Sequence, residues 1–254
     1  MGGARRDGDR RGGAGGRLSG IAVAVGCVLF LGGFVWAAVL YQPYAVPTNS
    51  MEPTVERGSR VLAERIDGDE VRRGDVVVFQ DKAWGDLPMV KRVVGVGGDT
   101  VACCDRDGRL TINGTPVEEP YLRLGRGAPA SPTEFSATVP DGKLFLLGDH
   151  RNDSLDSREH LTDQSNGTVD RAAVEARVDA TAWPLGSLGM LDRPSGFDPL
   201  PGGTSEPGPL RPLTLAVAAG AVLILVGAAW TPVARLLARR RGGRPERTTE
   251  VVGG

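Results

Sequence analysis

The chain has little of the chemistry that binds metals, cofactors or nucleic acids. It contains only two histidines, His150 and His160, and three cysteines in 254 residues. Neither set has the spacing of a zinc site or of a thioredoxin-like redox motif. The stretch Gly95-Val-Gly-Gly98 lacks the strand, Gly-rich turn and helix of a dinucleotide site. A formal net charge of −1 suggests no nucleic-acid partner. We therefore expect no metal and no cofactor.

The small net charge conceals basic ends and an acidic middle. Residues 1–17 carry five arginines against two aspartates, and residues 235–254 carry six arginines against two glutamates. The remaining 19 basic and 27 acidic residues give the interior a net charge of −8. Arginine-rich flanks of this kind are typical of the cytoplasmic side of a membrane protein.

Two long uncharged runs adjoin the basic tails, Leu18 to Tyr41 and Pro212 to Ala234. The first has 24 residues, and at about 1.5 Å per residue it exceeds the roughly 30 Å hydrocarbon core. A cleaved signal peptide is the alternative for the first run, but its apolar region is typically about 7–15 residues. A buried core helix is the alternative for the second. We expect transmembrane helices at 18–41 and 212–234, with cytoplasmic tails at 1–17 and 235–254.

The segment between these helices is predicted to be mainly β, with little helix. Short β-branched runs at Asp75–Phe79, Val90–Val96 and Val174–Leu185 indicate strands. Asn113-Gly114 predicts a hairpin with a primed turn, whose inward face is Leu110, Ile112 and Val117. Residues 122–141 are expected to be an irregular excursion, and residues 189–211 are a Gly/Pro-rich linker or wall of loops.

Of three further features, the second and the third leave alternatives open. Cys27 lies in the first apolar run as a small apolar filler. Cys103 and Cys104 are adjacent, so they are either two packed thiols or a strained vicinal bridge. Trp84, Leu87 and Met89 are either part of an exposed patch that touches lipid or substrate, or part of the core.

The stretch Pro47-Thr-Asn-Ser-Met-Glu-Pro-Thr54 places a serine on a non-helical loop, because the two prolines prevent a helix from running through it. Three more motifs follow: Arg73-Gly-Asp-Val-Val-Val-Phe79, Lys91-Arg-Val-Val-Gly-Val-Gly-Gly-Asp99 and Gly148-Asp-His-Arg-Asn-Asp-Ser-Leu-Asp-Ser-Arg158. In sequence and in order, these four boxes resemble those of the type I signal peptidases, membrane-bound Ser/Lys proteases of bacteria. The resemblance covers roughly Pro47 to Pro184.

The resemblance implies that Ser50 is the nucleophile and Lys91 its general base. A lysine near pKa 10.4 must be lowered by roughly 3 units, about 4 kcal/mol, to be mostly neutral near pH 7. Burial among valines acts in this direction. A strand-edge lysine kept for solubility is the alternative for Lys91 alone.

The same resemblance implies roles for the surrounding residues. The hydroxyl of Thr48, where the family commonly has serine, and the backbone N–H of Ser50 would stabilise the oxyanion. Ser154 would orient the lysine, and Asp149, Asp156 and Arg158 would support the site. A turn rich in turn-forming residues is the plainer interpretation of this last box, and both can hold.

The last box departs from the common family form, with His150 where asparagine is usual and Asn152-Asp153 in reverse order. His150 raises the alternative of a Ser/His dyad, or of a triad, with Ser50. Arg92 is expected to form an ion pair, because a guanidinium does not deprotonate in proteins.

Together the sequence predicts a multi-pass serine endopeptidase of the bacterial plasma membrane. Its catalytic domain, residues 42–188, would lie on the extracytoplasmic side, with secretory preproteins and the lipid bilayer as partners. Two alternatives remain: a related Ser/Lys protease that processes one dedicated partner, and an inactive membrane-anchored binding module.

Overall fold

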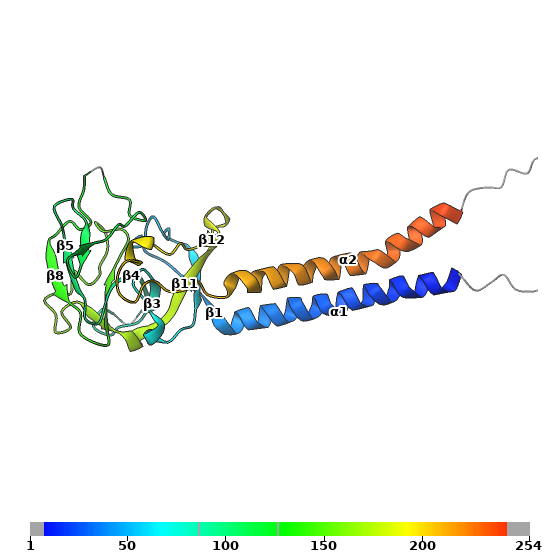
Figure 1. The fold of residues 1–254 in the computed structure, drawn as a ribbon, viewed down its shortest axis with the longest axis horizontal. Coiled ribbons are helices and arrows are strands. Elements are labelled where there is room, and N and C mark those ends of the chain that lie inside the picture. Colours follow the sequence, from blue (N-terminus) through cyan, green and yellow to red (C-terminus); the bar gives the residue numbers. More distant parts are fainter. Residues whose placement is uncertain (1–7, 86, 126, 243–254) are drawn as a thin grey trace, which may run out of the picture. The chain divides into compact units, whose positions relative to one another are not determined.

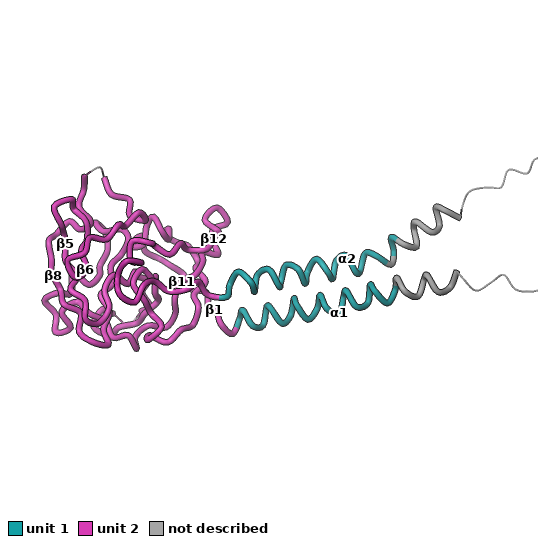
Figure 2. Tube along the Cα trace, in the orientation of Figure 1, with its two compact units in different colours: residues 1–38, 209–254 teal, residues 39–208 magenta. Residues whose placement is uncertain are grey.

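The computed structural model describes residues 8–85, 87–125 and 127–242. The chain divides into two units, residues 39–208 and the two ends of the chain that precede and follow them (Figure 2). The outer parts of the predicted tails, residues 1–7 and 243–254, lie outside the described residues.

The terminal unit is built on two long helices, α1 (Gly8–Leu40) and α2 (Leu210–Gly242) (Figure 1). Ser19 Oγ of α1 donates a hydrogen bond to the carbonyl of Gly227 in α2 at 2.7 Å. A Cβ at Gly26 would lie 2.8 Å from the Gly220 carbonyl oxygen, so small residues allow this close approach. Both helices are long and apolar enough to cross a membrane over Gly16–Leu40 and Leu210–Trp230.

Most strands of the other unit belong to a large antiparallel sheet. Its core strands carry uninterrupted apolar runs because both faces are buried. In β3, Val76 and Val78 enter one core cluster, whereas Val77 and Phe79 enter another. The strands in spatial order are β1 (Tyr41–Ala45), β2 (Arg60–Glu64), β11 (Val174–Trp183), β3 (Val76–Phe79), β4 (Met89–Val96), β9 (Lys143–Leu147) and β10 (Thr168–Asp170), and β12 (Gly189–Met190) pairs with β11.

A smaller sheet contains the predicted hairpin. Thr111 pairs with Pro116 and Ile112 pairs with Thr115, and Asn113 and Gly114 both have positive φ, at 55° and 78°. This confirms the primed turn. The spatial order is β7 (Thr115–Pro116), β6 (Leu110–Ile112), β5 (Thr100–Cys103) and β8 (Phe135–Thr138), and single-turn 3-10 helices lie at η1 (Gly68–Glu70), η2 (Arg171–Ala173), η3 (Leu185–Ser187) and η4 (Ser195–Phe197).

Strand β8 corrects the expectation that residues 122–141 are irregular. Phe135 and Ala137 are buried while Ser136 and Thr138 are exposed, an alternation typical of a half-buried strand. The segment between the helices is β-rich as expected, whereas the chain taken together is mixed, with 28% helix and 26% strand. The two terminal helices, at 33 residues each, account for this mixed content around a β-rich domain.

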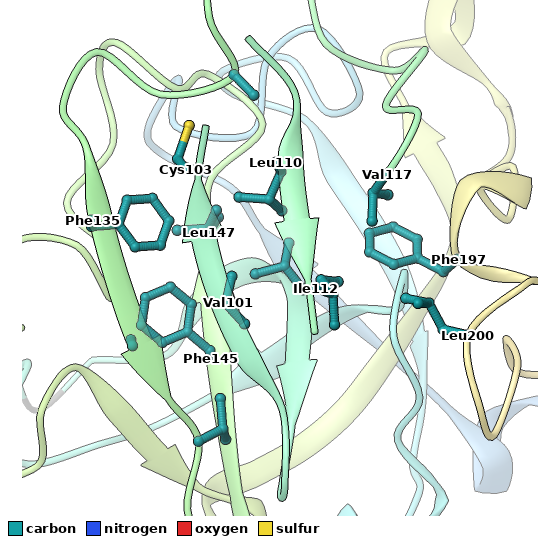
Figure 3. Packing of buried hydrophobic residues seen from close by; sticks show 14 residues of the cluster. Val101, Cys103, Leu110, Ile112, Val117, Phe135, Phe145, Leu147, Phe197 and Leu200 are labelled. Atoms are coloured by element: carbon teal, nitrogen blue, oxygen red, sulfur yellow. The ribbon is translucent and has the colours of Figure 1, made fainter. Parts of the chain in front are cut away.

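The core between the sheets also takes in the Gly/Pro-rich segment 189–211. Phe197 and Leu200 belong to the cluster that contains Val117 and Ile112, and Phe197 lies beside Val117 (Figure 3). Nearby, a disulfide joins Cys103 to Cys104. Of the possible surface patch, Trp84 is buried whereas Leu87 is 75% exposed.

Candidate active site

Ser50 lies in the loop between β1 and β2, which are at one edge of the large sheet, and the loop reaches Lys91 of β4. The loop is anchored by Met51 and Val55, both fully buried in a core cluster, and is closed by a hydrogen bond from the Val46 N–H to the Ser59 carbonyl at 2.9 Å. These contacts fix the backbone on both sides of the serine. Ser50 itself is only 6% exposed.

Lys91 comes from β4, where it is in register with Val77 of β3. Its Nζ donates a hydrogen bond to Ser50 Oγ at 2.8 Å, and the residue is 5% exposed. Burial lowers the pKa of Lys91 to about 8, although the charges of Asp156 and Asp149 act to raise it. A sizeable fraction of the lysine is therefore neutral near pH 8 and able to accept a proton.

The predicted oxyanion residue lies on the same loop as the serine. Thr48 Oγ1 is 3.3 Å from Ser50 Oγ, and Thr48 is exposed at the rim of the site. Its hydroxyl is thus next to the nucleophile and accessible to a carbonyl oxygen that binds there.

The loop Gly148–Arg158 surrounds the dyad with paired charges. Arg92 donates two hydrogen bonds to Asp149, at 2.9 and 2.7 Å, and Thr54 donates a third to the same carboxylate at 2.5 Å. Arg158 forms a second bidentate pair with Asp156, at 2.8 and 2.7 Å. Burial alone would raise the pKa of Asp156, but Arg158 holds it below its ordinary value. Asp156 is thus held as a carboxylate.

Ser154 lies against Gly148. Its buried Oγ is close enough to Asp156 to help lower the pKa of that carboxyl. Among the described residues no hydrogen bond joins Ser154 to Lys91, so its orienting role stays a prediction.

The two histidines have other positions. The backbone N–H of His150 donates to the Ser50 carbonyl at 3.0 Å, while its Nδ1 is buried without a partner among the described residues. The His160 ring stacks on Trp84 with centroids 4.4 Å apart, and its Nδ1 is 2.7 Å from Asp163 Oδ2. Within the described residues neither imidazole is hydrogen-bonded to Ser50 Oγ, so the geometry favours lysine as the base.

A cleft of about 300 Å³ opens beside Ser50 and Lys91. A larger cavity, about 590 Å³, lies elsewhere, around Arg109 and Glu118, and contains neither residue of the dyad. Apolar side chains dominate the wall of the smaller cleft. Its lining residues are Ala45, Val46, Pro47, Thr48, Asn49, Ser50, Pro88, Met89, Val90, Lys91, Asp153 and Leu155.

Residues 18–183 match the family model described as signal peptidase, peptidase S26. The chain belongs to this family. It is 31% identical over 222 residues to a probable signal peptidase I of Mycobacterium leprae, covering 64% of this chain and 76% of that protein. It is 35% identical over 164 residues to signal peptidase I of Bacillus licheniformis, covering 61% of this chain and 83% of that protein. A crystal structure of a signal peptidase I from Enterococcus faecalis V583 has 31% identity and a TM-score of 0.35, covering 42% of this chain and 94% of that one.

Membership in the signal peptidase family confirms the resemblance drawn from the four boxes. The protein is a serine peptidase that cleaves signal peptides, and preproteins are its substrates. With two candidate spans in a bacterial membrane enzyme family, it is a membrane protein.

Sequence reasoning missed part of the charged layer around this signal peptidase site. Arg151 forms a buried pair with Glu119, at 3.0 and 2.5 Å, and the Tyr121 ring lies 3.9 Å from the Arg92 guanidinium carbon. No signal in the boxes pointed to Glu119, since the last box itself offers three aspartates, Asp149, Asp153 and Asp156, for its arginines and Arg92. Only the folded structure shows that Arg151 takes its carboxylate from outside the boxes.

Proposed function

We propose that this signal peptidase cleaves preproteins with a Ser50/Lys91 dyad. Neutral Lys91 takes the proton of the Ser50 hydroxyl as Oγ attacks the carbonyl carbon of the scissile bond. The resulting ammonium then gives that proton to the leaving amine of the mature protein. This leaves an ester between Ser50 and the signal peptide. Lys91 then takes a proton from a water molecule as the water oxygen attacks the ester carbonyl, and gives that proton to Ser50 Oγ as the signal peptide leaves with a free carboxyl group.

The observation that carries this proposal is the 2.8 Å contact between Lys91 Nζ and Ser50 Oγ in a buried site. Burial lowers the pKa of Lys91 to about 8, which is near the optimum for a general base at physiological pH. The developing oxyanion would be stabilised by the Thr48 hydroxyl and the Ser50 N–H. Ser154 would orient the lysine.

The cleft supports a preference for small side chains one and three positions before the cut. Its volume of about 300 Å³ and its lining by Val46, Met89 and Val90 suit short apolar side chains. We propose that residues 42–188 form the peptidase domain and that 189–211 connects it to the second span.

The arginine-rich ends support cytoplasmic termini and an extracytoplasmic domain. Tags at the two termini would then be protected from protease in intact spheroplasts and digested in inverted vesicles. The reverse result would overturn this topology.

The dyad is tested with the detergent-solubilised full chain and a purified preprotein, comparing wild type with Ser50→Ala, Lys91→Ala and His150→Ala. We expect the first two to abolish cleavage and the third to retain most of it. Loss of activity only in His150→Ala would reassign the base to histidine. A panel of unrelated preproteins distinguishes a general enzyme, which cuts many of them, from one dedicated to a single partner.

A further inference from the structure

The substrate cleft contains a second charged side chain besides the general base. Among the lining residues, only Lys91 and Asp153 carry ionisable groups. Lys91 is buried and engaged with Ser50, whereas Asp153 is exposed. A substrate that enters this cleft thus encounters an apolar wall with one accessible carboxylate.

The position of Asp153 is fixed by the nucleophile loop. Its Oδ2 accepts a hydrogen bond from Asn49 Nδ2 at 2.6 Å, and Asn49 directly precedes Ser50. Its backbone N–H donates to the His150 carbonyl at 2.9 Å, which makes a turn in the loop that follows β9. The carboxylate is therefore held against Asn49, the residue that precedes the nucleophile in the sequence.

The charge of Asp153 is not neutralised by the protein. No ion pair found in residues 8–85, 87–125 and 127–242 includes it. This separates it from Asp149 and Asp156, which are buried and paired with Arg92 and Arg158. A carboxylate with a neutral amide as its hydrogen-bond partner keeps its full charge for a ligand.

We infer that Asp153 is a specificity-determining residue that selects preproteins with a lysine or arginine side chain close to the scissile bond and disfavours acidic ones. A cation there gains an ion pair with the carboxylate, and an anion meets repulsion from it. Because Asp153 is solvent-exposed, each effect is small and is screened by salt. This inference rests on the proposed dyad, which places the cut beside Ser50.

The test uses the full chain in detergent and one signal-peptide substrate with alanine one and three positions before the cut. Lysine, glutamate or alanine is placed in turn at each other position from three before to three after the cut. We expect kcat/KM for lysine to exceed that for glutamate by about 3- to 10-fold at one or more positions. The difference should lie in KM, because the charge acts on bound substrate and transition state alike, and should shrink in high salt.

The decisive variant is Asp153→Asn, which keeps an oxygen to accept from Asn49 and removes the charge. We expect it to lose the preference for lysine over glutamate, measured as the ratio of kcat/KM for the two substrates within the same variant. Glu159→Gln is the matched control, since Glu159 is exposed, belongs to the following turn and does not line the cleft. It should keep the wild-type preference.

The outcomes separate this inference from the proposed function. If wild type cuts the alanine substrate but shows no charge preference, or if Asp153→Asn keeps the preference, the role of Asp153 is overturned and the dyad stands. If wild type cuts none of the substrates, the proposed function fails and this inference fails with it.

Discussion

Lys91 and Arg92 are neighbours on β4, and both are buried, at 5% and 1% exposure, but their surroundings differ in one respect. Lys91 forms its hydrogen bond with a neutral hydroxyl, whereas Arg92 forms a bidentate ion pair with Asp149. Burial lowers the pKa of Lys91 to about 8. For Arg92 burial acts in the same direction, but the charge and hydrogen bonds of Asp149 raise the pKa overall.

The comparison shows how Lys91 can be neutral although charged side chains lie close to it. A cation without an ion-pair partner loses the solvation that stabilises its charged form. The carboxylates that could supply such a partner, Asp149 and Asp156, are both occupied by arginines. The two ion pairs therefore stabilise the site, and they also engage the carboxylates that could otherwise form an ion pair with the lysine.

The largest expected effect comes from exchanging the two cations. Lys91→Arg keeps a positive charge but supplies a group that does not deprotonate. We expect kcat/KM for a preprotein to fall by at least about 10³-fold, because a general base and the activation of the nucleophile are lost together. Arg92→Lys is the reciprocal control, and it should keep activity within about 10-fold because the base is intact. Cleavage by Lys91→Arg at a rate near wild type would exclude lysine as the base.

Removing the guanidinium of Arg92 should mainly affect stability. Arg92→Met leaves Asp149 buried without its ion-pair partner, which typically costs about 3–5 kcal/mol. Urea unfolding followed by circular dichroism measures this loss. The double variant Arg92→Met/Asp149→Leu removes both charges, so it should be more stable than the single variant. If the double variant is less stable than Arg92→Met, the other contacts of Asp149 stabilise the fold more than its ion pair with Arg92 does.

The long helices and the hairpin could be predicted from local signals, the two uncharged runs and the Asn113-Gly114 pair. Ser50 and Lys91 are 41 residues apart, and only the resemblance could bring them together before the fold was known. Strand β8 was missed because Gly, Pro and Ser surround four alternating residues. The contribution of Glu119 and Tyr121 could not be predicted, since their role depends on long-range contacts with Arg151 and Arg92 that no local pattern encodes.

The pH dependence of kcat/KM should give the pKa of Lys91 directly. Lys91 acts as a base only when neutral, so kcat/KM should rise about tenfold per pH unit below its pKa and level off above about 8. Asp156 acts to raise this pKa, so Asp156→Asn should move the midpoint to lower pH. Glu159→Gln, which removes an exposed charge from the turn that follows this loop, should leave the midpoint in place. A midpoint that moves upward in Asp156→Asn would contradict this account.

The smallest expected effect concerns the face of Arg92 that is not paired with a carboxylate. The Tyr121 ring stacks on the guanidinium at 3.9 Å, and a cation–π contact of this kind is worth about 0.5–2 kcal/mol. Tyr121→Leu should therefore lower the free energy of unfolding by about that amount, with the pH midpoint of cleavage unchanged. Tyr121→Phe keeps the ring and loses only the hydrogen bond to Glu119, so it should lie closer to wild type. If both variants lose the same stability, the hydroxyl and not the ring supports Arg92, and the site depends on Glu119 at this point.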